Sequence, residues 1–147
     1  MEALPAAPPT GEGLLITLPG RDIEFAIRKG VAGMPIGRLA QVRSALPGQP
    51  IFLFDTDARL LHGPYAASGP GGANLDPASS KLPAQVKFTP VVRSFAPLPE
   101  EVAGDLLTWQ PGPGKGSRRP ASKVDAAVVG PLLLLFVLRH HNLLNQK

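Results

Sequence analysis

A chain of 147 residues is long enough to bury one sizeable core, and 44% hydrophobic residues indicate a folded protein. The absence of cysteine excludes disulfides, thiolate nucleophiles and cysteine-based zinc sites, while 16 glycines and 18 prolines predict many turns. The net charge of +4 permits an acidic partner but carries no information about the fold.

The N-terminal segment is rich in proline and alanine, which predicts a disordered tail over residues 1–12. It has neither a basic start nor an apolar core, so we do not expect a signal peptide. The longest apolar stretch, residues 126–138, is shorter than a membrane span and is interrupted by Pro131. We therefore expect an intracellular protein, cytoplasmic or nuclear, with no membrane partner.

The first third of the chain predicts one strand and two helices. The apolar run 13–17 fits a strand. Asp22 is the expected N-cap of a first helix, which should end at Gly30. A second helix is expected to end at Pro47 and to have one apolar face, formed by Leu39, Val42 and Leu46.

The middle of the chain predicts a hairpin. Residues 51–54 are apolar without alternation, which is typical of a strand covered on both faces. Asp55 and Asp57 fit the turn, because aspartate side chains accept hydrogen bonds from their own backbone. The return strand is expected over residues 59–65. Pro64 cannot donate a ladder hydrogen bond, so this strand should lie at an edge or carry a bulge.

A glycine loop, residues 68–73, follows the predicted hairpin. After it, Gln85 and Lys87 alternate with apolar neighbours, which predicts a half-exposed strand. Pro99 should then lead a short helix that begins with two glutamates.

The C-terminal part predicts a loop, a helix and a tail. Residues 110–122 lack an apolar anchor and predict a disordered basic loop. The last helix should begin after Ser122 as its N-cap and end at Leu138, and residues 139–147 should form a tail. These elements together predict an α+β fold: a small mixed sheet or partly closed barrel with packed helices and a C-terminal helix, in a single domain over 13–138.

Neither glycine-rich loop fits a phosphate-binding motif. The loop at 68–76 lacks the Gly-Lys-Ser/Thr ending that places an ammonium and a hydroxyl on a bound triphosphate. In the second loop, Lys115 is followed by Gly116, and no buried strand is expected before it. A glycine loop as plain architecture is therefore the favoured interpretation.

The histidines do not form a recognisable catalytic or metal-binding set. His62 is best interpreted as a partly buried side chain that donates a hydrogen bond to the sheet. The alternative, a small enzyme built around His62 and Asp76, requires the two side chains to meet in a pocket. His140 and His141 are adjacent, so on a helix they point in different directions. We therefore expect no enzyme, no cofactor and no metal.

Four basic residues lie in or next to the predicted loop: Lys115, Arg118, Arg119 and Lys123. Such an arm can bind phosphates nonspecifically, although charges in a loop more often serve only as solvated surface. Beside the phenylalanines, Trp109 and Tyr65 are the only aromatic residues. A base-reading surface normally needs several stacking platforms, so nucleic acid is a possible but weakly supported partner.

Five blocks follow one another in a fixed order: AGMP (32–35), PGQPIFLF (47–54), LHG (61–63), GGANLDP (71–77) and LPAQV (82–86). Their order and spacing resemble the Development and Cell Death (DCD) domain of plant and green-algal proteins, best over 33–100. The chain departs from the family pattern at 65–67 and at 114–122. The resemblance implies a structural role for the matched positions, which are Gly33, Pro35, Pro47, Gly48, Phe52, Phe54, His62, Gly63, Pro77, Pro83 and Gln85.

The resemblance implies a fold like the small RNA-reading barrels of the YTH and PUA-like type, without catalysis. It also implies a non-enzymatic protein-interaction or regulatory module in stress responses and programmed cell death, with protein partners. An RNA-binding module is the alternative. The expected surface combines a sheet edge, the glycine loop and the basic arm: Tyr65, Gly71, Gly72, Asn74, Asp76, Lys115, Arg118 and Arg119.

Overall fold

The computed structural model describes residues 11–78, 80–90 and 95–144, so most of the predicted tail at 1–12 lies outside the described residues. The main sheet contains β1 (Gly13–Leu18), β2 (Val31–Met34), β3 (Pro50–Asp55), β4 (Leu60–Ala67), β5 (Gly72–Ala73), β6 (Ala84–Pro90), β7 (Leu98–Pro99) and β10 (Lys123–Val124). A separate hairpin contains β8 (Trp109–Pro111) and β9 (Arg118–Pro120). The helices are α1 (Gly20–Lys29), η1 (Ile36–Arg38), α2 (Leu39–Arg43), α3 (Glu100–Ala103), η2 (Gly104–Leu106) and α4 (Ala126–Leu144).

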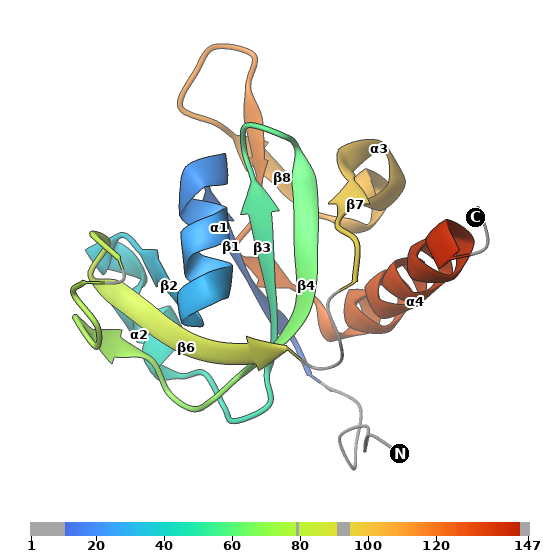
Figure 1. Cartoon of the computed structure of the whole chain (residues 1–147). Coiled ribbons are helices and arrows are strands. Elements are labelled where there is room, and N and C mark those ends of the chain that lie inside the picture. The colour runs from blue at the N-terminus through green and yellow to red at the C-terminus, as the bar shows by residue number, and fades with distance from the viewer. Residues whose placement is uncertain (1–10, 79, 91–94, 145–147) are drawn as a thin grey trace, which may run out of the picture.

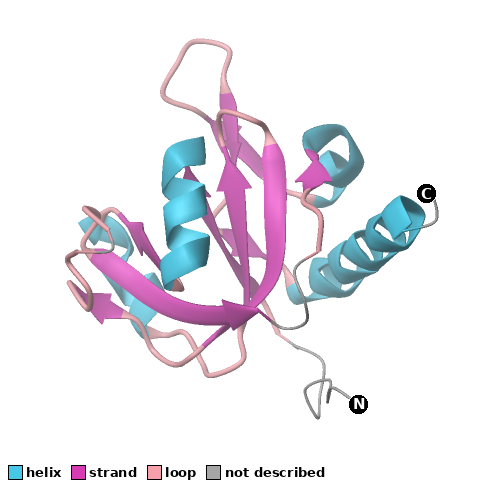
Figure 2. Cartoon of the chain, in the orientation of Figure 1, coloured by secondary structure: helices cyan, strands magenta, loops and turns pink. Residues whose placement is uncertain are grey.

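The main sheet is mixed and strongly curved. Its order is β10-β1-β3-β4-β6-β2, with β5 paired to β6 and β7 paired to β4. β1 and β3 run parallel, whereas the other neighbours run antiparallel. The long β6 bends around α1 to reach β2, and α4 lies on the other side of the sheet (Figures 1 and 2). The predicted α+β class, with a partly open sheet and a C-terminal helix, is confirmed.

The two central strands separate two hydrophobic cores. Successive side chains of a strand point to opposite faces, so residues of β3 alternate between the cores. Ile51 and Leu53 pack with residues of α1 and α2, whereas Phe52 and Phe54 pack with residues of α3 and α4. All four side chains are fully buried, which confirms the predicted strand covered on both faces.

The first helix starts earlier than predicted. It begins at Gly20, and Asp22 lies in its first turn instead of capping it. The cap comes from a distant residue: the Gly20 N–H donates to Asp57 Oδ2 at 2.8 Å, from the β3–β4 turn. The predicted end at Gly30 is confirmed, because this residue adopts a left-handed φ of 71° and donates its N–H to the Ala26 carbonyl.

The second helix is shorter than predicted. It ends at Arg43, and Leu46 is 69% exposed, so its expected place on a buried face is wrong. The following Pro47 disfavours a helical conformation for Leu46. Gly48, with a φ of 85°, then turns the chain so that its N–H reaches the Ala67 carbonyl.

The predicted irregularity at Pro64 is a bulge and not an edge. The register of β3 against β4 shifts between Ile51 and Leu53, opposite Gly63 and Pro64. β4 is an inner strand, paired with β3 on one side and with β6 and β7 on the other. Of the two alternatives that the sequence left open, the bulge is confirmed, and the strand continues past Tyr65 to Ala67.

Residues 109–120 form a hairpin where the sequence predicts a disordered loop. Trp109 pairs with Pro120, and Pro111 pairs with Arg118. At the turn the Gly112 N–H donates to the Ser117 carbonyl at 2.9 Å. The anchor that the sequence did not reveal is the Trp109 ring, which packs against the second core.

The last helix is shifted along the chain relative to its prediction. It begins at Ala126, because Ser122 is used elsewhere: its carbonyl accepts from the Leu15 N–H and its hydroxyl bonds to Gln41. The helix passes through Pro131, which has no backbone N–H and therefore removes one intrahelical hydrogen bond. It continues to Leu144, so residues 139–144 are helical and not part of a tail. Among the described residues, no helix meets the length and hydropathy of a membrane span.

Candidate functional site

A pocket of about 540 Å³ lies between α1, the first residues of β2 and residues 77–78 and 80–82. Its lining residues are Leu18, Arg21, Asp22, Phe25, Ala26, Val31, Ala32, Gly33, Pro77, Ala78, Ser80, Lys81 and Leu82. This volume falls in the range of small-molecule sites. We refer to it as the α1 pocket.

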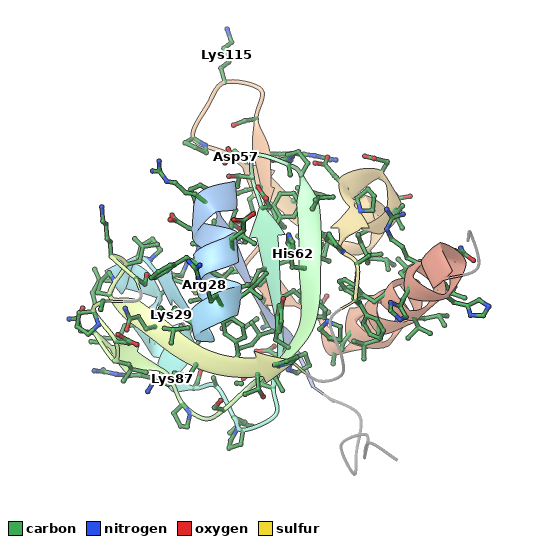
Figure 3. All side chains as sticks on the ribbon, in the orientation of Figure 1. Arg28, Lys29, Asp57, His62, Lys87 and Lys115 are labelled. Atoms are coloured by element: carbon green, nitrogen blue, oxygen red, sulfur yellow. The ribbon has the colours of Figure 1, made fainter. Side chains whose placement is uncertain are left out.

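The wall of the α1 pocket that is formed by α1 combines an aromatic ring with positive charge. The Phe25 ring is half-buried, and the Arg28 guanidinium and the Lys29 ammonium lie 5.5 and 5.8 Å from its centre. Arg28 and Lys29 lie beside the lining, whose own charges are two cations, Arg21 and Lys81, and one carboxylate. Figure 3 shows Arg28 and Lys29 together on α1. The pocket therefore suits a ligand that is flat, apolar on its faces and negatively charged.

The opposite wall of the α1 pocket is held in place by Gln85, the side chain that we expected to be exposed. That expectation is wrong: Gln85 is 0% exposed. Its Oε1 accepts from the Asp76 N–H at 2.7 Å, and its Nε2 lies 3.1–3.2 Å from the carbonyls of Asp76, Ser80 and Leu82. The Gln85 amide thus provides hydrogen-bond partners for a backbone segment that pairs little with neighbouring strands. This is the physical reason why the amide is buried.

Gly33 allows this wall to approach β2. A Cβ at this position would clash with Ser80 Oγ and would lie 2.7 Å from the Leu82 carbonyl oxygen. The glycine loop is packed in the same way. A Cβ on Gly71 would clash with the Gln85 carbonyl and lie 2.8 Å from Val42 Cβ, and the Gly71 N–H donates to the Val42 carbonyl.

The glycine-loop half of the predicted surface is architecture. Asn74 adopts a positive φ of 51° and donates its N–H to the Pro83 carbonyl. Gly72 pairs with Gln85 as part of β5. Asp76 is bound through its backbone to the same side chain. These residues form the scaffold behind the α1 pocket and do not line it.

Tyr65 lies on the inner strand β4 and is half-buried. Its ring packs against Phe88, with 4.9 Å between the ring centres. Burial raises the pKa of the Tyr65 phenol to about 12. The structure thus places Tyr65 against the first core and not on the expected sheet edge.

The three basic residues of the predicted surface separate in the structure. Lys115 projects from the tip of the β8–β9 hairpin (Figure 3), far from the glycine loop (Figure 1). Arg118 and Arg119 are neighbours on β9, so they point to opposite faces. The Arg118 guanidinium stacks on the Trp109 ring at 4.1 Å, while Arg119 lines a small second pocket beside β1.

Arg118 is held by a carboxylate that it shares with Arg59. Glu100 Oε2 accepts from Arg118 at 3.0 Å, and Glu100 Oε1 accepts from Arg59 Nε at 2.6 Å. Burial by itself would raise the pKa of the Glu100 carboxyl, but the two arginines outweigh it, and the pKa is lowered. This cluster fastens the hairpin to α3 and leaves Arg118 as a structural residue.

His62 lies on β4 opposite Leu53 and is half-buried. Burial lowers the pKa of the imidazole, and the nearby Asp55 charge partly opposes this. Among the described residues the His62 imidazole donates no hydrogen bond to the sheet and makes no contact with Asp76, so the expected side-chain bond is wrong. The described part of the chain also contains no cluster of metal-ligating side chains.

The other family-motif positions occupy cores and turns. Phe52 stacks on Phe136 and Phe54 packs edge-on to Trp109. Gly63 allows close approach at the bulge, because a Cβ there would lie 2.9 Å from the Phe52 ring. The remaining positions are at turns or segment ends: Pro35 before η1, Pro47 and Gly48 before β3, Pro77 in the pocket wall and Pro83 before β6.

The sequence analysis did not identify Phe25, Arg21 and Lys81 as site residues. The available signal was an aromatic residue on a surface helix with four charged residues, three basic and one acidic, three or four positions away from it. That signal is weak until the fold places the other wall of the α1 pocket opposite the helix.

The comparisons with known proteins agree on family and fold. The model of the Development and cell death domain matches residues 13–110. The DCD domain-containing protein NRP of Arabidopsis thaliana is 30% identical over 122 residues, which cover 76% of this chain and 34% of the relative. NRP-A of Glycine max is 30% identical over 79% of this chain and 32% of its own length. The B2 protein of Daucus carota is 29% identical over 76% of this chain and 58% of its own length. The chain thus spans about a third of the two NRP relatives.

Solved structures with a similar fold are YTH domains. One is the YTH domain of Zygosaccharomyces rouxii MRB1 in complex with N6-methyladenosine RNA, with a TM-score of 0.62 and 17% identity, covering 90% of this chain and 93% of that one. The Pho92 YTH domain in complex with m6A gives a TM-score of 0.61 and 12% identity, covering 90% and 89%. At these identities the likeness establishes the fold alone. With its family model matched over residues 13–110, the chain belongs to the Development and cell death (DCD) domain family.

Proposed function

We propose that this DCD domain is a non-catalytic module that binds single-stranded RNA in the α1 pocket. The observation that carries the proposal is the Phe25 ring in the pocket wall, flanked by Arg28 and Lys29. Aromatic rings that stack on bases, together with cations that follow the phosphates, are the usual components of a single-strand site. The similar YTH structures contain N6-methyladenosine, as RNA in one case, which supports the same ligand class here.

The α1 pocket has the size for one nucleoside but lacks a second aromatic wall. Phe25 is the only aromatic residue among the described residues of its lining, and Trp109 lies elsewhere, on β8. A base would stack on Phe25 on one side and contact the aliphatic side chains of Leu18 and Val31 on the other. We therefore propose binding of an unpaired base with modest sequence preference.

The first test is a titration of the purified chain with a fluorescein-labelled single-stranded RNA at low and physiological salt. Phe25→Ala should weaken binding by roughly 5- to 150-fold, which corresponds to the loss of one stacked base. Lys87→Gln is a matched control. Lys87 is exposed and lies opposite Val31 in the sheet register, but it alternates with the buried side chains of β6 that face α1.

The result decides the proposal in either direction. Binding that persists at physiological salt and is lost in Phe25→Ala, with circular dichroism unchanged, supports it. Absence of wild-type binding, or equal losses in Phe25→Ala and Lys87→Gln, would show that the α1 pocket is not a base site.

A second candidate function is protein interaction, supported by the outer face of α4. Leu134, Val137 and Leu138 are 57%, 48% and 48% exposed. They belong to an exposed stripe on the side of α4 opposite the buried Val129, Leu132 and Phe136. The exposed stripe is Ala127, Gly130, Pro131, Leu134, Val137, Leu138 and His141. A helix that is apolar all round is normally covered on both sides.

We propose a second copy of the chain as the partner. The stripe has small residues before Leu134 and large ones after it. An antiparallel pair centred on Leu134 would place the small half of each helix against the large half of the other, with no Asp, Glu, Lys or Arg on the stripe and His141 at its end. Such self-complementarity is what a two-fold interface requires. As a regulatory module, the chain would act inside the cell in stress responses and in the cell death that the family name indicates.

Analytical ultracentrifugation over a concentration series tests the pairing. The wild type should show a weak, concentration-dependent dimer, and Leu134→Glu should be monomeric because the charge enters the interface twice. Val102→Glu, on α3 and 42% exposed, is the matched control and should dimerise like the wild type. A wild type that stays monomeric at the highest concentration contradicts the pairing and leaves RNA binding untouched.

A further inference from the structure

The curved sheet is open between β1 and β2. The order β10-β1-β3-β4-β6-β2 ends at β10 and β2, and β10 pairs only with Gly13 and Leu14 of β1. The rest of this side of β1 lies close to β2 without pairing to it. Edge strands leave backbone donors and acceptors available for a ligand. The α1 pocket opens along this seam, since Leu18 and Gly33 contribute to its lining.

A second, smaller pocket lies further along the same seam. Its volume is about 100 Å³, less than a fifth of that of the α1 pocket. Its small size suits a compact group such as a phosphate. Its lining is Leu15, Ile16, Thr17, Gly33, Met34, Pro35, Arg38, Gln110, Arg119, Pro120 and Ser122. Gly33 borders both pockets, so they are neighbours along the seam. We refer to this second pocket as the seam pocket.

The seam pocket contains two arginines and no acid. Arg38 comes from η1 and Arg119 from β9, 81 residues later in the chain, so only the tertiary fold brings them to one site. Neither guanidinium has an ion pair among the described residues, in contrast to Arg118, which is held by Glu100. The Thr17 hydroxyl and the Gln110 amide add neutral hydrogen-bonding groups.

Two unpaired arginines facing one small pocket are typical of a phosphate site. The planar guanidinium matches the oxygens of a phosphate in a bidentate manner, and its charge is independent of pH in the physiological range. Successive side chains of β9 point to opposite faces, and this decides which arginine enters the seam pocket. Arg118 faces the Trp109 ring, and Arg119 is therefore directed to the other face, toward β1.

We infer that Arg38 and Arg119 bind the backbone phosphate of the nucleotide next to the one held in the α1 pocket. This inference rests on the proposed RNA binding and adds the direction of the strand, along the β1/β2 seam from α1 toward the hairpin. It assigns Arg119 a ligand-binding role and Arg118 a structural one.

The first arm of the test uses dimethyl phosphate, a small phosphodiester without a base. In ¹⁵N-resolved NMR spectra, the side-chain Nε–H signals of Arg38 and Arg119 should shift on titration, and that of Arg43 should not. Arg43 is exposed at the end of α2 and lines neither pocket. Assignment follows from the signals that disappear in Arg38→Gln, Arg119→Gln and Arg43→Gln.

The second arm uses the labelled RNA at several salt concentrations. The double variant Arg38→Gln/Arg119→Gln should weaken binding by roughly tenfold, the loss of charge-assisted hydrogen bonds. It should also lower the slope of log K against log salt by about 0.7, the value for one neutralised phosphate of a single strand. Arg43→Gln should leave both quantities near those of the wild type.

The outcomes separate this inference from the proposed function. RNA binding by the wild type with an unchanged slope in the double variant overturns the phosphate site and leaves the α1 pocket standing. A wild type that binds no RNA overturns both as stated. In that case shifts of Arg38 and Arg119 with dimethyl phosphate would mark an anion site for another ligand, and their absence would exclude one.

Discussion

The two glycine-rich segments of the chain, 68–76 and 111–117, are similar in composition but are held by different forces. The first is fixed by the buried Gln85 amide and by the Gly71 N–H bond to Val42. The second is the turn of an exposed hairpin, held by its own hydrogen bonds and by Arg118 on Glu100. The stability of the first segment should therefore depend on the shape of its side chains, and that of the second on their charge.

The largest effect is expected at the buried amide. Gln85→Leu leaves the Asp76 N–H and three carbonyls without a partner, and should reduce the free energy of unfolding by about 3–5 kcal/mol. Urea unfolding measures it. Gln49→Leu, which removes two exposed hydrogen bonds, is the control and should cost about 1 kcal/mol. Equal costs would contradict the central role of Gln85.

The next effect concerns packing in the first segment. Gly71→Ala places a methyl group 2.8 Å from Val42 Cβ, and should cost about 1–3 kcal/mol through overpacking. Gly69→Ala should be nearly neutral, since a Cβ there meets nothing within 4 Å. Thermal unfolding of the two variants tests the difference. Similar melting temperatures would mean that the loop is not packed tightly.

A smaller effect is expected in the second segment. Glu100→Gln keeps the shape but removes the charge that Arg118 and Arg59 share, and should cost about 0.5–1 kcal/mol. Hydrogen exchange of the β9 amides should become faster in the variant.

The dependence on salt and pH identifies this contribution as electrostatic. The difference from the wild type should shrink in 1 M salt. Because the pKa of Glu100 is lowered in the folded state, its stabilisation is present above the usual pKa of a glutamate and is lost as the pH falls through the folded value. A difference that persists in high salt and in acid would contradict the ionic origin.

The smallest effect concerns the titration of the Tyr65 phenol, which occurs at high pH and leaves the protein unchanged at neutral pH. Tyr65 is the only tyrosine, so its phenolate can be followed by ultraviolet absorbance. The midpoint should lie near 12, since burial raises this pKa. The raised value means that the stabilisation is complete below pH 10 and is lost as the pH rises through 12. A midpoint near 10 would place Tyr65 in solvent.

The fold could be predicted largely from local patterns. Residues 51–54 indicated a strand between two apolar layers, because the side chains directed to each face of the strand are apolar. The structure confirms this prediction. Gly30 indicated the end of the first helix, because only glycine adopts a left-handed φ at low cost. The five ordered blocks indicated the family, which the match over 13–110 establishes.

The candidate site could not be predicted in the same way. Phe25 was an ordinary aromatic residue of a surface helix until Lys81 and its neighbours were placed opposite it. Arg118 and Arg119 are adjacent in the sequence, and only their places around Trp109 and β1 assign them different roles. The bonds of Gln85 depend on carbonyls that a polar–apolar pattern does not locate.

The sequence by itself determined which faces of each element are apolar and where the chain turns, because these depend on side chains a few residues apart. The tertiary structure decided what covers each face. It placed Asp57 at the start of α1, 37 residues away, and it brought Arg38 and Arg119 to one pocket. A local pattern specifies that a group needs a partner, but only the packing of distant segments specifies which partner it has.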